Sequence, residues 1–218
     1  MRSYQGSLFA LGSPSIDHET PVRRVWLDDT AWIDRADGWL IGADALLIDL
    51  DASLPWRGGR RPMYGRLVDE PRLHATLDHG AEDRPVFTEI AHTLEARYGP
   101  GLRAGFVNYY RDGRDSVAWH ADRIGRHEVD PIVAIISLGG PRRFGLRPKA
   151  GGAGRQLVLH TGDLLVMGGA CQHTWEHCVP KMRSAPPRMS LSYRHIPDRP
   201  DRAWWPITPT PTTDRRIK

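Results

Sequence analysis

The sequence predicts an α+β protein that is mainly β, with helices in its first half and an antiparallel β-rich second half. Apolar side chains recur at helical spacing in two segments before residue 100. After that point, short β-rich runs alternate with glycine and proline. The composition, with 40% hydrophobic and 26% charged residues, is typical of a soluble globular chain and not of a disordered one.

The two predicted helices are defined by their apolar stripes and their ends. The first covers residues 42–54 and stops before Pro55. Its stripe consists of Leu46, Leu47, Leu50 and Leu54. The second is capped by Asp83, carries Pro85 in its first turn and ends before Gly99. Its stripe consists of Phe87, Ile90, Leu94 and Tyr98. Both helices are expected to serve as scaffold.

Seven short strands are expected from Leu102 onward, and their spacing predicts a sandwich, jelly roll or barrel. They are Ala104–Tyr110, Ser116–His120, Pro131–Leu138, Gln156–His160, Asp163–Met167, Gln172–Val179 and Arg188–His195.

His120-Ala121-Asp122 is the first chemical signal, because residues i and i+2 of a strand share a face. One more histidine would complete a 2-His-1-carboxylate face, which leaves positions on iron(II) open for substrate and oxygen. His177 is the preferred third ligand, and His173, four residues earlier, is the alternative. A His-x-Asp pair without a third ligand is usually a solvated surface pair.

Strict alternation marks the segment Arg188–Arg194. Met189, Leu191 and Tyr193 share the face that is expected to pack, and Arg188, Ser190, Ser192 and Arg194 share the other. Two inward arginines need anionic partners, and a guanidinium matches a carboxylate bidentately, so a short dicarboxylate is a suitable ligand. The alternative is an edge strand with two solvated arginines. Asn108 and Tyr110 form a similar pair that can hold a carboxylate or keto oxygen.

In their order along the chain, these motifs resemble the AlkB-type iron(II)- and 2-oxoglutarate-dependent dioxygenases. Asn108-Tyr109-Tyr110 resembles the Asn-x-Tyr motif of the family, His120-Ala121-Asp122 its His-x-Asp motif, and Arg188–Arg194 its R-x-N-L-[ST]-[FY]-R signature. The weaker matches, within a resemblance that covers about residues 55–197, are Arg60–Gly65, Gly162–Met167 and Trp175–His177.

The resemblance implies a double-stranded β-helix (jelly-roll) core with the N-terminal helices packed on it, one Fe(II), 2-oxoglutarate as co-substrate, and O₂. The implied iron ligands are His120, Asp122 and His177. The implied 2-oxoglutarate residues, with one arginine near each carboxylate, are Asn108, Tyr110, Arg188 and Arg194. The usual reaction of the family is oxidative demethylation of N-alkylated bases such as 1-methyladenine and 3-methylcytosine in DNA or RNA. This direct reversal of alkylation damage releases formaldehyde, succinate and CO₂.

Two positions depart from the family pattern. Ser190 stands where the signature usually has asparagine, and its shorter side chain is expected to weaken one contact to 2-oxoglutarate. Ile124 stands where many nucleic-acid repair members carry a second acid, so the preferred base is left open.

The net charge of +4 is unevenly distributed along the chain. Residues 57–66, 142–155 and 181–218 carry net charges of +4, +5 and +6. Clustered positive charge beside a site suits a phosphate backbone, although most charge runs are solvated faces. The residues expected to contact the substrate, with Tyr64 stacking on a flipped base, are Arg61, Met63, Tyr64 and Arg147.

We expect a single dioxygenase domain over residues 1–218, made of an N-terminal helical and substrate-loop extension (1–100), a catalytic β core (101–197) and a tail (198–218). With only two cysteines and no apolar run long enough to span a membrane, we expect a cytoplasmic monomer whose partner is alkylated DNA or RNA. The alternatives are the same chemistry on a protein or small molecule, or a non-catalytic nucleic-acid-binding module.

Overall fold

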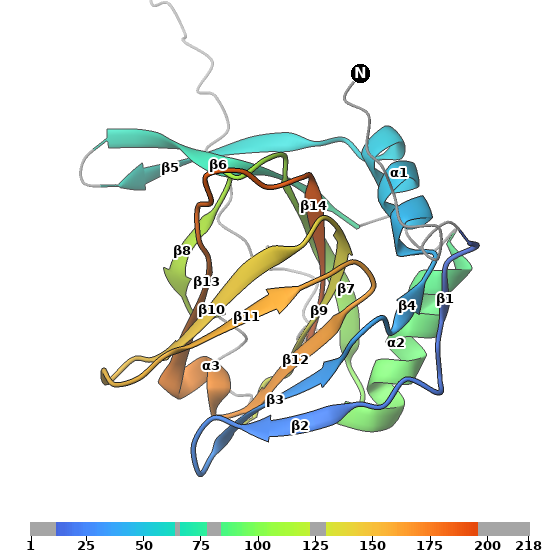
Figure 1. Cartoon of the computed structure of the whole chain (residues 1–218), viewed down its shortest axis with the longest axis horizontal. Helices are drawn as coiled ribbons and strands as arrows, with labels where there is room; N and C mark the ends of the chain where they lie inside the picture. Colours follow the sequence, from blue (N-terminus) through green and yellow to red (C-terminus); the bar gives the residue numbers. More distant parts are fainter. Residues whose placement is uncertain (1–11, 64–65, 78–83, 123–129, 196–218) are drawn as a thin grey trace, which may run out of the picture.

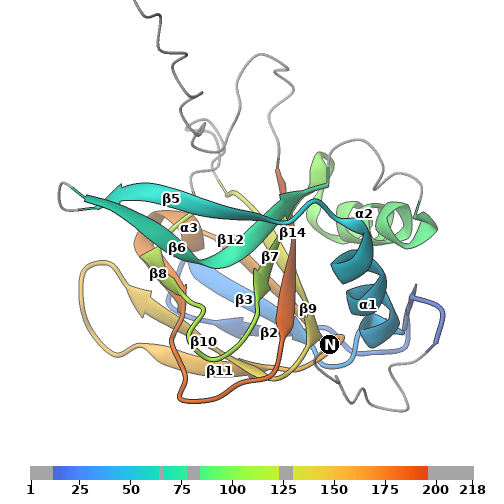
Figure 2. The same cartoon turned by 90° about the horizontal axis from the view of Figure 1, so that it is seen from above.

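Two antiparallel sheets face each other and form the body of the protein (Figures 1 and 2). The computed structural model describes residues 12–63, 66–77, 84–122 and 130–195, without the side chains of residues 61–69. Within these residues, one sheet has eight strands in the order β2-β3-β12-β9-β14-β7-β6-β5, and the other has four in the order β11-β10-β13-β8. This arrangement confirms the prediction of a mainly β fold.

The strands of the larger sheet are β2 (Arg23–Trp26), β3 (Ala31–Ala36), β12 (Leu164–Gly169), β9 (Val133–Gly139), β14 (Arg188–His195), β7 (Leu102–Tyr110), β6 (Arg66–Thr76) and β5 (Arg57–Met63). Those of the smaller sheet are β11 (Arg155–Leu159), β10 (Arg142–Pro148), β13 (Trp175–Val179) and β8 (Val117–His120). A separate short pair is formed by β1 (Ser15–Ile16) and β4 (Leu40–Ile41).

Helices α1 (Ala43–Ser53) and α2 (Pro85–Tyr98) pack on the outer face of the larger sheet (Figure 1), and both confirm the helices predicted from periodicity. The N-cap position of α2 is taken by Arg84, while Asp83, the predicted cap, lies outside the described residues. Gly42 precedes α1 with a φ of 67°, and a Cβ there would lie 2.4 Å from the carbonyl oxygen of Gly12. Only glycine fits this junction.

The two faces of β14 point into different environments, as its alternation predicts. Met189, Leu191 and Tyr193 are fully buried in the core beneath the helices. Arg188 and Ser190 point the other way, into the space between the two sheets, because side chains alternate along a strand. A second apolar core fills part of that space, so the polar side chains of β14 lie next to packed apolar ones.

The fold departs from the sequence prediction mainly where the chain is rich in arginine. Two strands that the sequence did not predict, β5 and β10, form in segments that read as basic loops, and β6, also not predicted, follows β5. The predicted strand Gln172–Val179 is wrong in its first part, because Cys171–Thr174 form the short helix α3 before β13 begins. The larger sheet joins strands from both sides of residue 100, since β3 pairs with β12 and β6 pairs with β7. No helix in the described part of the chain has the length and apolar character needed to cross a membrane.

Candidate active site

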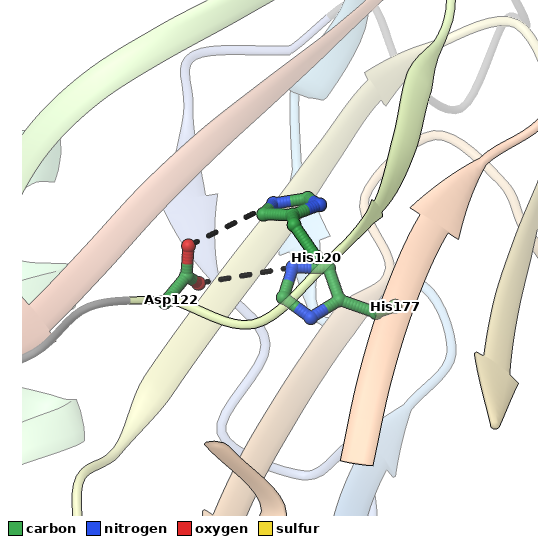
Figure 3. A group of neighbouring side chains, drawn as sticks. All are labelled: His120, Asp122 and His177. Atoms are coloured by element: carbon green, nitrogen blue, oxygen red, sulfur yellow. Dashed lines mark ion pairs between the residues drawn. The ribbon is translucent and has the colours of Figure 1, made fainter. Parts of the chain in front are cut away.

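His120, Asp122 and His177 converge between the sheets and offer three donor atoms to one point (Figure 3). Their ligand atoms all lie within 4.8 Å of one another. The strand ladder explains the convergence of the histidines, because His120 on β8 is the direct register partner of His177 on β13. Asp122 follows two residues later, and its carboxylate lies 3.8 Å from the Nε2 atom of each histidine.

The carboxylate of Asp122 is buried and only half satisfied. Its Oδ1 atom lies 2.9 Å from the guanidinium of Arg194, whereas Oδ2 is buried without a hydrogen-bond partner among the described residues. Burial raises the pKa of Asp122, but the electrostatic influence of its neighbours, first the Arg194 guanidinium, outweighs burial and holds the pKa below its usual value. The site therefore presents an ionised carboxylate with one oxygen available, which is what a metal requires.

Both histidines are oriented for binding through Nε2. The Nδ1 atom of His120 lies 2.9 Å from the carbonyl oxygen of Ala118, which fixes the ring and leaves Nε2 toward Asp122. The ring of His177 stacks on Phe144, and burial, the largest influence, lowers its pKa to about 4, so its imidazole is neutral at physiological pH. Two imidazole nitrogens and one carboxylate fit Fe(II) with open coordination positions. His120 remains 39% exposed, so the site is open on that side.

His173, the alternative ligand in the sequence prediction, does not join this group. It lies exposed on α3, and within the described residues the cluster forms with His177.

The residues predicted for 2-oxoglutarate are polar side chains between the sheets, and one of them, Arg194, contacts the metal group directly through Asp122. Arg188 is 1% exposed, and its Nε donates to the Ser137 hydroxyl at 3.0 Å. Its guanidinium lies 5.3 Å from the ring of Tyr110, which is also buried. The NH2 group of Arg188 and the Nε of Arg194 are both buried without a partner in the described part of the chain. Each arginine thus offers one unused donor, which fits a dianion with two carboxylates.

Asn108 is held by a residue that the sequence did not single out. Arg72 on β6 donates from Nε to the Asn108 Oδ1 atom at 2.9 Å. Because the amide oxygen is used in this way, its NH₂ group is turned away from Arg72 and remains a donor. Ser190 pairs in register with Asn108 on one side and Ser137 on the other, so the shorter side chain lies in a row of small polar groups.

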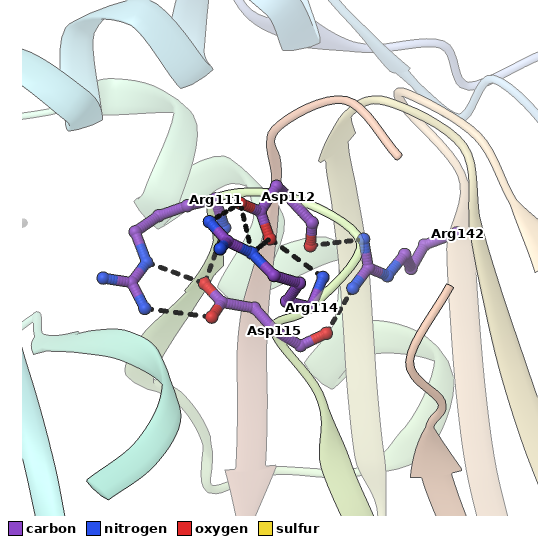
Figure 4. A network of polar contacts seen from close by, with 5 residues as sticks. All are labelled: Arg111, Asp112, Arg114, Asp115 and Arg142. Carbon is purple, nitrogen blue, oxygen red and sulfur yellow. Dashed lines mark hydrogen bonds and ion pairs between the residues drawn. The ribbon is translucent and has the colours of Figure 1, made fainter. Parts of the chain in front are cut away.

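The loop after Tyr110 is braced by a buried arginine (Figure 4). Arg142, 1% exposed on β10, donates to the backbone carbonyl oxygens of Asp112, at 2.9 Å, and Asp115. The carboxylate of Asp115 in turn accepts three hydrogen bonds from Arg111, one from the backbone N–H and two from the guanidinium. Arg142 therefore anchors the connection between β7 and β8, the strands that carry Tyr110 and His120.

The residues predicted to contact the substrate are less well defined. Arg61 and Met63 belong to β5, but their side chains are outside the described part, as are Tyr64 and the departure position Ile124. Arg147 points away from the metal group. It pairs with Glu176 at 2.7 Å, and its guanidinium lies 4.3 Å from the exposed ring of Trp119.

The second basic segment is largely used within the fold. Arg142 is buried, Arg147 is paired with Glu176, and Lys149 donates to two carbonyl oxygens of α3. Arg57, which is exposed on the β5–β6 hairpin, is therefore a better candidate for contact with a polyanion.

Several residues of the site, such as Arg72, Ser137, Arg142 and Gln172, carry no signal in the sequence. Each meets a partner that is far away along the chain: Arg72 and Asn108 are 36 residues apart, and Gln172 and Asp122 are 50 apart. Such residues become neighbours only when the sheets and α3 have assembled.

Comparison with known proteins identifies the class of protein. The family model described as 2OG-Fe(II) oxygenase superfamily matches residues 73–203, and the chain belongs to this superfamily. Members of this superfamily are described as using Fe(II) and 2-oxoglutarate. The His-Asp-His group is suited to Fe(II), and the neighbouring arginines Arg188 and Arg194 are suited to 2-oxoglutarate.

Individual relatives narrow the class to the AlkB type. The chain is 32% identical over 185 residues to the alpha-ketoglutarate-dependent dioxygenase alkB homolog 3 of Homo sapiens, covering 75% of this chain and 65% of that protein. It is 31% identical over 191 residues to the DNA oxidative demethylase ALKBH2 of Arabidopsis thaliana, covering 67% of this chain and 60% of that protein. The chain thus spans less than two thirds of each relative.

A solved chain described as the structure of OsALKBH1 shares the fold. It matches with a TM-score of 0.50 and 17% identity, over 70% of this chain and 92% of that chain.

Proposed function

We propose that this protein is an Fe(II)- and 2-oxoglutarate-dependent dioxygenase that oxidatively demethylates N-alkylated nucleobases in DNA or RNA. The observation that carries the proposal is the His-Asp-His group with one unpartnered carboxylate oxygen, together with two nearby arginines that each have an unused buried donor. The names of the relatives, which include a DNA oxidative demethylase, support the choice of substrate.

The residues divide the work by position. His120, Asp122 and His177 would hold the iron, and Arg194 would keep the Asp122 carboxylate ionised and oriented. When bound, iron supplies with 2-oxoglutarate and O₂ the oxidation that converts an N-methyl group to a hydroxymethyl group, which leaves as formaldehyde. Arg188 and Tyr110 would hold one end of 2-oxoglutarate, and Asn108 and Arg194 the other.

The β5–β6 hairpin supports nucleic acid as the substrate. It lies directly beside the residues proposed to hold 2-oxoglutarate, because His74 on β6 pairs in register with Asn108 on β7 (Figure 2). Its first strand presents the exposed arginine Arg57, which suits a phosphate backbone.

Four side chains complete the proposed substrate interface. On the hairpin, Arg61, Met63 and Tyr64 would contact the target nucleotide, with Tyr64 stacking on the flipped base. Arg147 would contribute after releasing Glu176.

The direct test incubates the protein with oligonucleotides that carry 1-methyladenine or 3-methylcytosine, together with iron(II), 2-oxoglutarate, O₂ and ascorbate. Mass spectrometry should show loss of one methyl group per damaged base and an equal amount of formaldehyde. His177→Ala should abolish both signals, while His173→Ala, the nearby histidine outside the metal group, should retain them. If 2-oxoglutarate were consumed without demethylation of single-stranded DNA, duplex DNA or RNA, the nucleic-acid substrate would be refuted. A protein or small molecule would then be the better candidate substrate.

We further propose that residues 1–218 act as one domain and as a cytoplasmic monomer. The shared sheet supports the single domain, and two buried cysteines that form no disulfide, Cys171 and Cys178, suit a reducing compartment. Light scattering of the purified chain tests the monomer.

A further inference from the structure

Asp122 is the one metal-group residue that no strand pairing holds. His120 and His177 are fixed to each other by the ladder between β8 and β13. That ladder stops at His120, and Asp122 lies beyond the end of β8. Its position must therefore come from side-chain contacts.

Gln172 supplies such a contact. Its amide oxygen accepts a hydrogen bond from the Asp122 backbone N–H at 2.9 Å. The other end of the same amide lies 3.7 Å from the Met167 sulfur, which accepts from Nε2. Since the Asp122 N–H can only donate, the oxygen must face Asp122, and both ends of the amide have a suitable partner. Gln172 is 4% exposed, so water does not readily replace this bond.

The element that carries Gln172 is itself rigidly attached. Within α3, the hydroxyl of Thr174 donates to the carbonyl oxygen of Ala170 at 3.0 Å, and the Ala170 N–H donates to Thr30 on the larger-sheet side at 3.0 Å. Lys149 on the smaller-sheet side donates to the carbonyl oxygen of Gln172 at 3.1 Å. Because α3 leads directly into β13, the amide of Gln172 is fixed relative to His177.

We propose that Gln172 is a positioning residue that ties the Asp122 main chain to the element bearing His177 and so sets the geometry of the metal group. This inference rests on the proposed iron site. Asp122 is then held at its backbone by Gln172 and at Oδ1 by Arg194, and these two contacts direct the unpartnered Oδ2 toward His177. Neither contact alone defines the direction of the carboxylate, because each leaves one rotation free.

The test compares Mn(II) binding to metal-free protein by titration calorimetry in two variants. Gln172→Met keeps the length of the side chain but removes the acceptor, and should weaken Mn(II) affinity tenfold or more, as loss of an outer hydrogen bond typically does. Gln156→Met, the same substitution at an exposed position of β11 (Arg155–Leu159), is the control and should leave the affinity within threefold. An unchanged affinity in Gln172→Met, or an equal loss in Gln156→Met, would overturn the inference.

A second measurement does not depend on metal. Hydrogen exchange of the Asp122 amide, followed by NMR in the metal-free protein, should be at least tenfold faster in Gln172→Met than in the wild type. Equal protection would overturn the tether. If the methionine variant does not fold, Gln172→Asn, whose oxygen is too short to reach, carries the same expectations. Wild-type protein that binds no Mn(II) would refute the proposed iron site, while amide exchange would still decide the role of Gln172.

Discussion

Arg188→Met is expected to stabilise the free protein and to weaken its binding of 2-oxoglutarate. Burial, opposed in part by Tyr110, lowers the pKa of Arg188 from 12.5 to about 10, so the folded protein bears the cost of a desolvated cation. This difference corresponds to roughly 3 kcal/mol, because one pKa unit is worth about 1.4 kcal/mol. Replacement also removes the hydrogen bond to Ser137, which costs about 1 kcal/mol, and the contact with Tyr110. The free energy of unfolding should therefore rise by about 1–2 kcal/mol.

The effect on the co-substrate has the opposite sign. In the variant, one carboxylate of bound 2-oxoglutarate loses its buried cation, and an unpaired buried charge costs about 3–5 kcal/mol. The dissociation constant should rise between about a hundredfold and several thousandfold. Urea denaturation with Mn(II), with and without 2-oxoglutarate, measures both effects. Arg143→Met, the same substitution at an exposed position of β10, is the control and should change the unfolding free energy by less than about 0.5 kcal/mol. The reasoning would be refuted if Arg188→Met were less stable than the wild type in the absence of 2-oxoglutarate. It would also be refuted if 2-oxoglutarate stabilised the variant and the wild type by the same amount.

Three further predictions concern the metal group and the scaffold. Asp122→Asn should lower Mn(II) affinity at least about a hundredfold in calorimetry, because it removes the only anionic ligand. Asp28 has its pKa lowered to about 2, chiefly by the hydrogen bond from the Trp175 indole, so its stabilisation is complete above about pH 4 and is lost toward pH 2. Acid unfolding of the wild type and Asp28→Asn should therefore converge near pH 2 and differ at pH 6. Gly145→Ala would place a Cβ 2.9 Å from the Trp119 ring and should cost about 1–3 kcal/mol in urea denaturation.

The elements that the sequence predicts well are those with a short-range pattern. Strand β14 has the predicted bounds because the alternation of Met189, Leu191 and Tyr193 with polar residues is unbroken over the whole segment. Helix α2 ends as predicted at Tyr98, where glycine and proline follow. The His-x-Asp motif was recognisable for the same reason, since two residues at spacing i and i+2 define a face without knowledge of the fold.

Secondary structure in arginine-rich segments is not predicted by such short-range patterns. Strand β10 contains three arginines, and a charge run is normally a solvated face. Here Arg142 is buried because two carbonyl oxygens of a loop about 30 residues earlier receive its guanidinium, and Arg147 is paired with Glu176 from the neighbouring strand. Such partners become adjacent only when the sheets form, so composition overstates the basic surface of this segment.

Strand β14 can orient the co-substrate because it carries two arginines with unpartnered donor atoms. Arg194 has one donor on Asp122 and one buried Nε without a partner, whereas Arg188 lies beside Tyr110 with an unused NH2 group. A dicarboxylate placed between them satisfies both donors at once. The end near Arg194 then lies next to the metal group, and the far end is desolvated against Arg188. Six residues of extended strand thus set both the distance and the direction of the co-substrate, and a monocarboxylate would leave the costlier cation, Arg188, without its counter-ion.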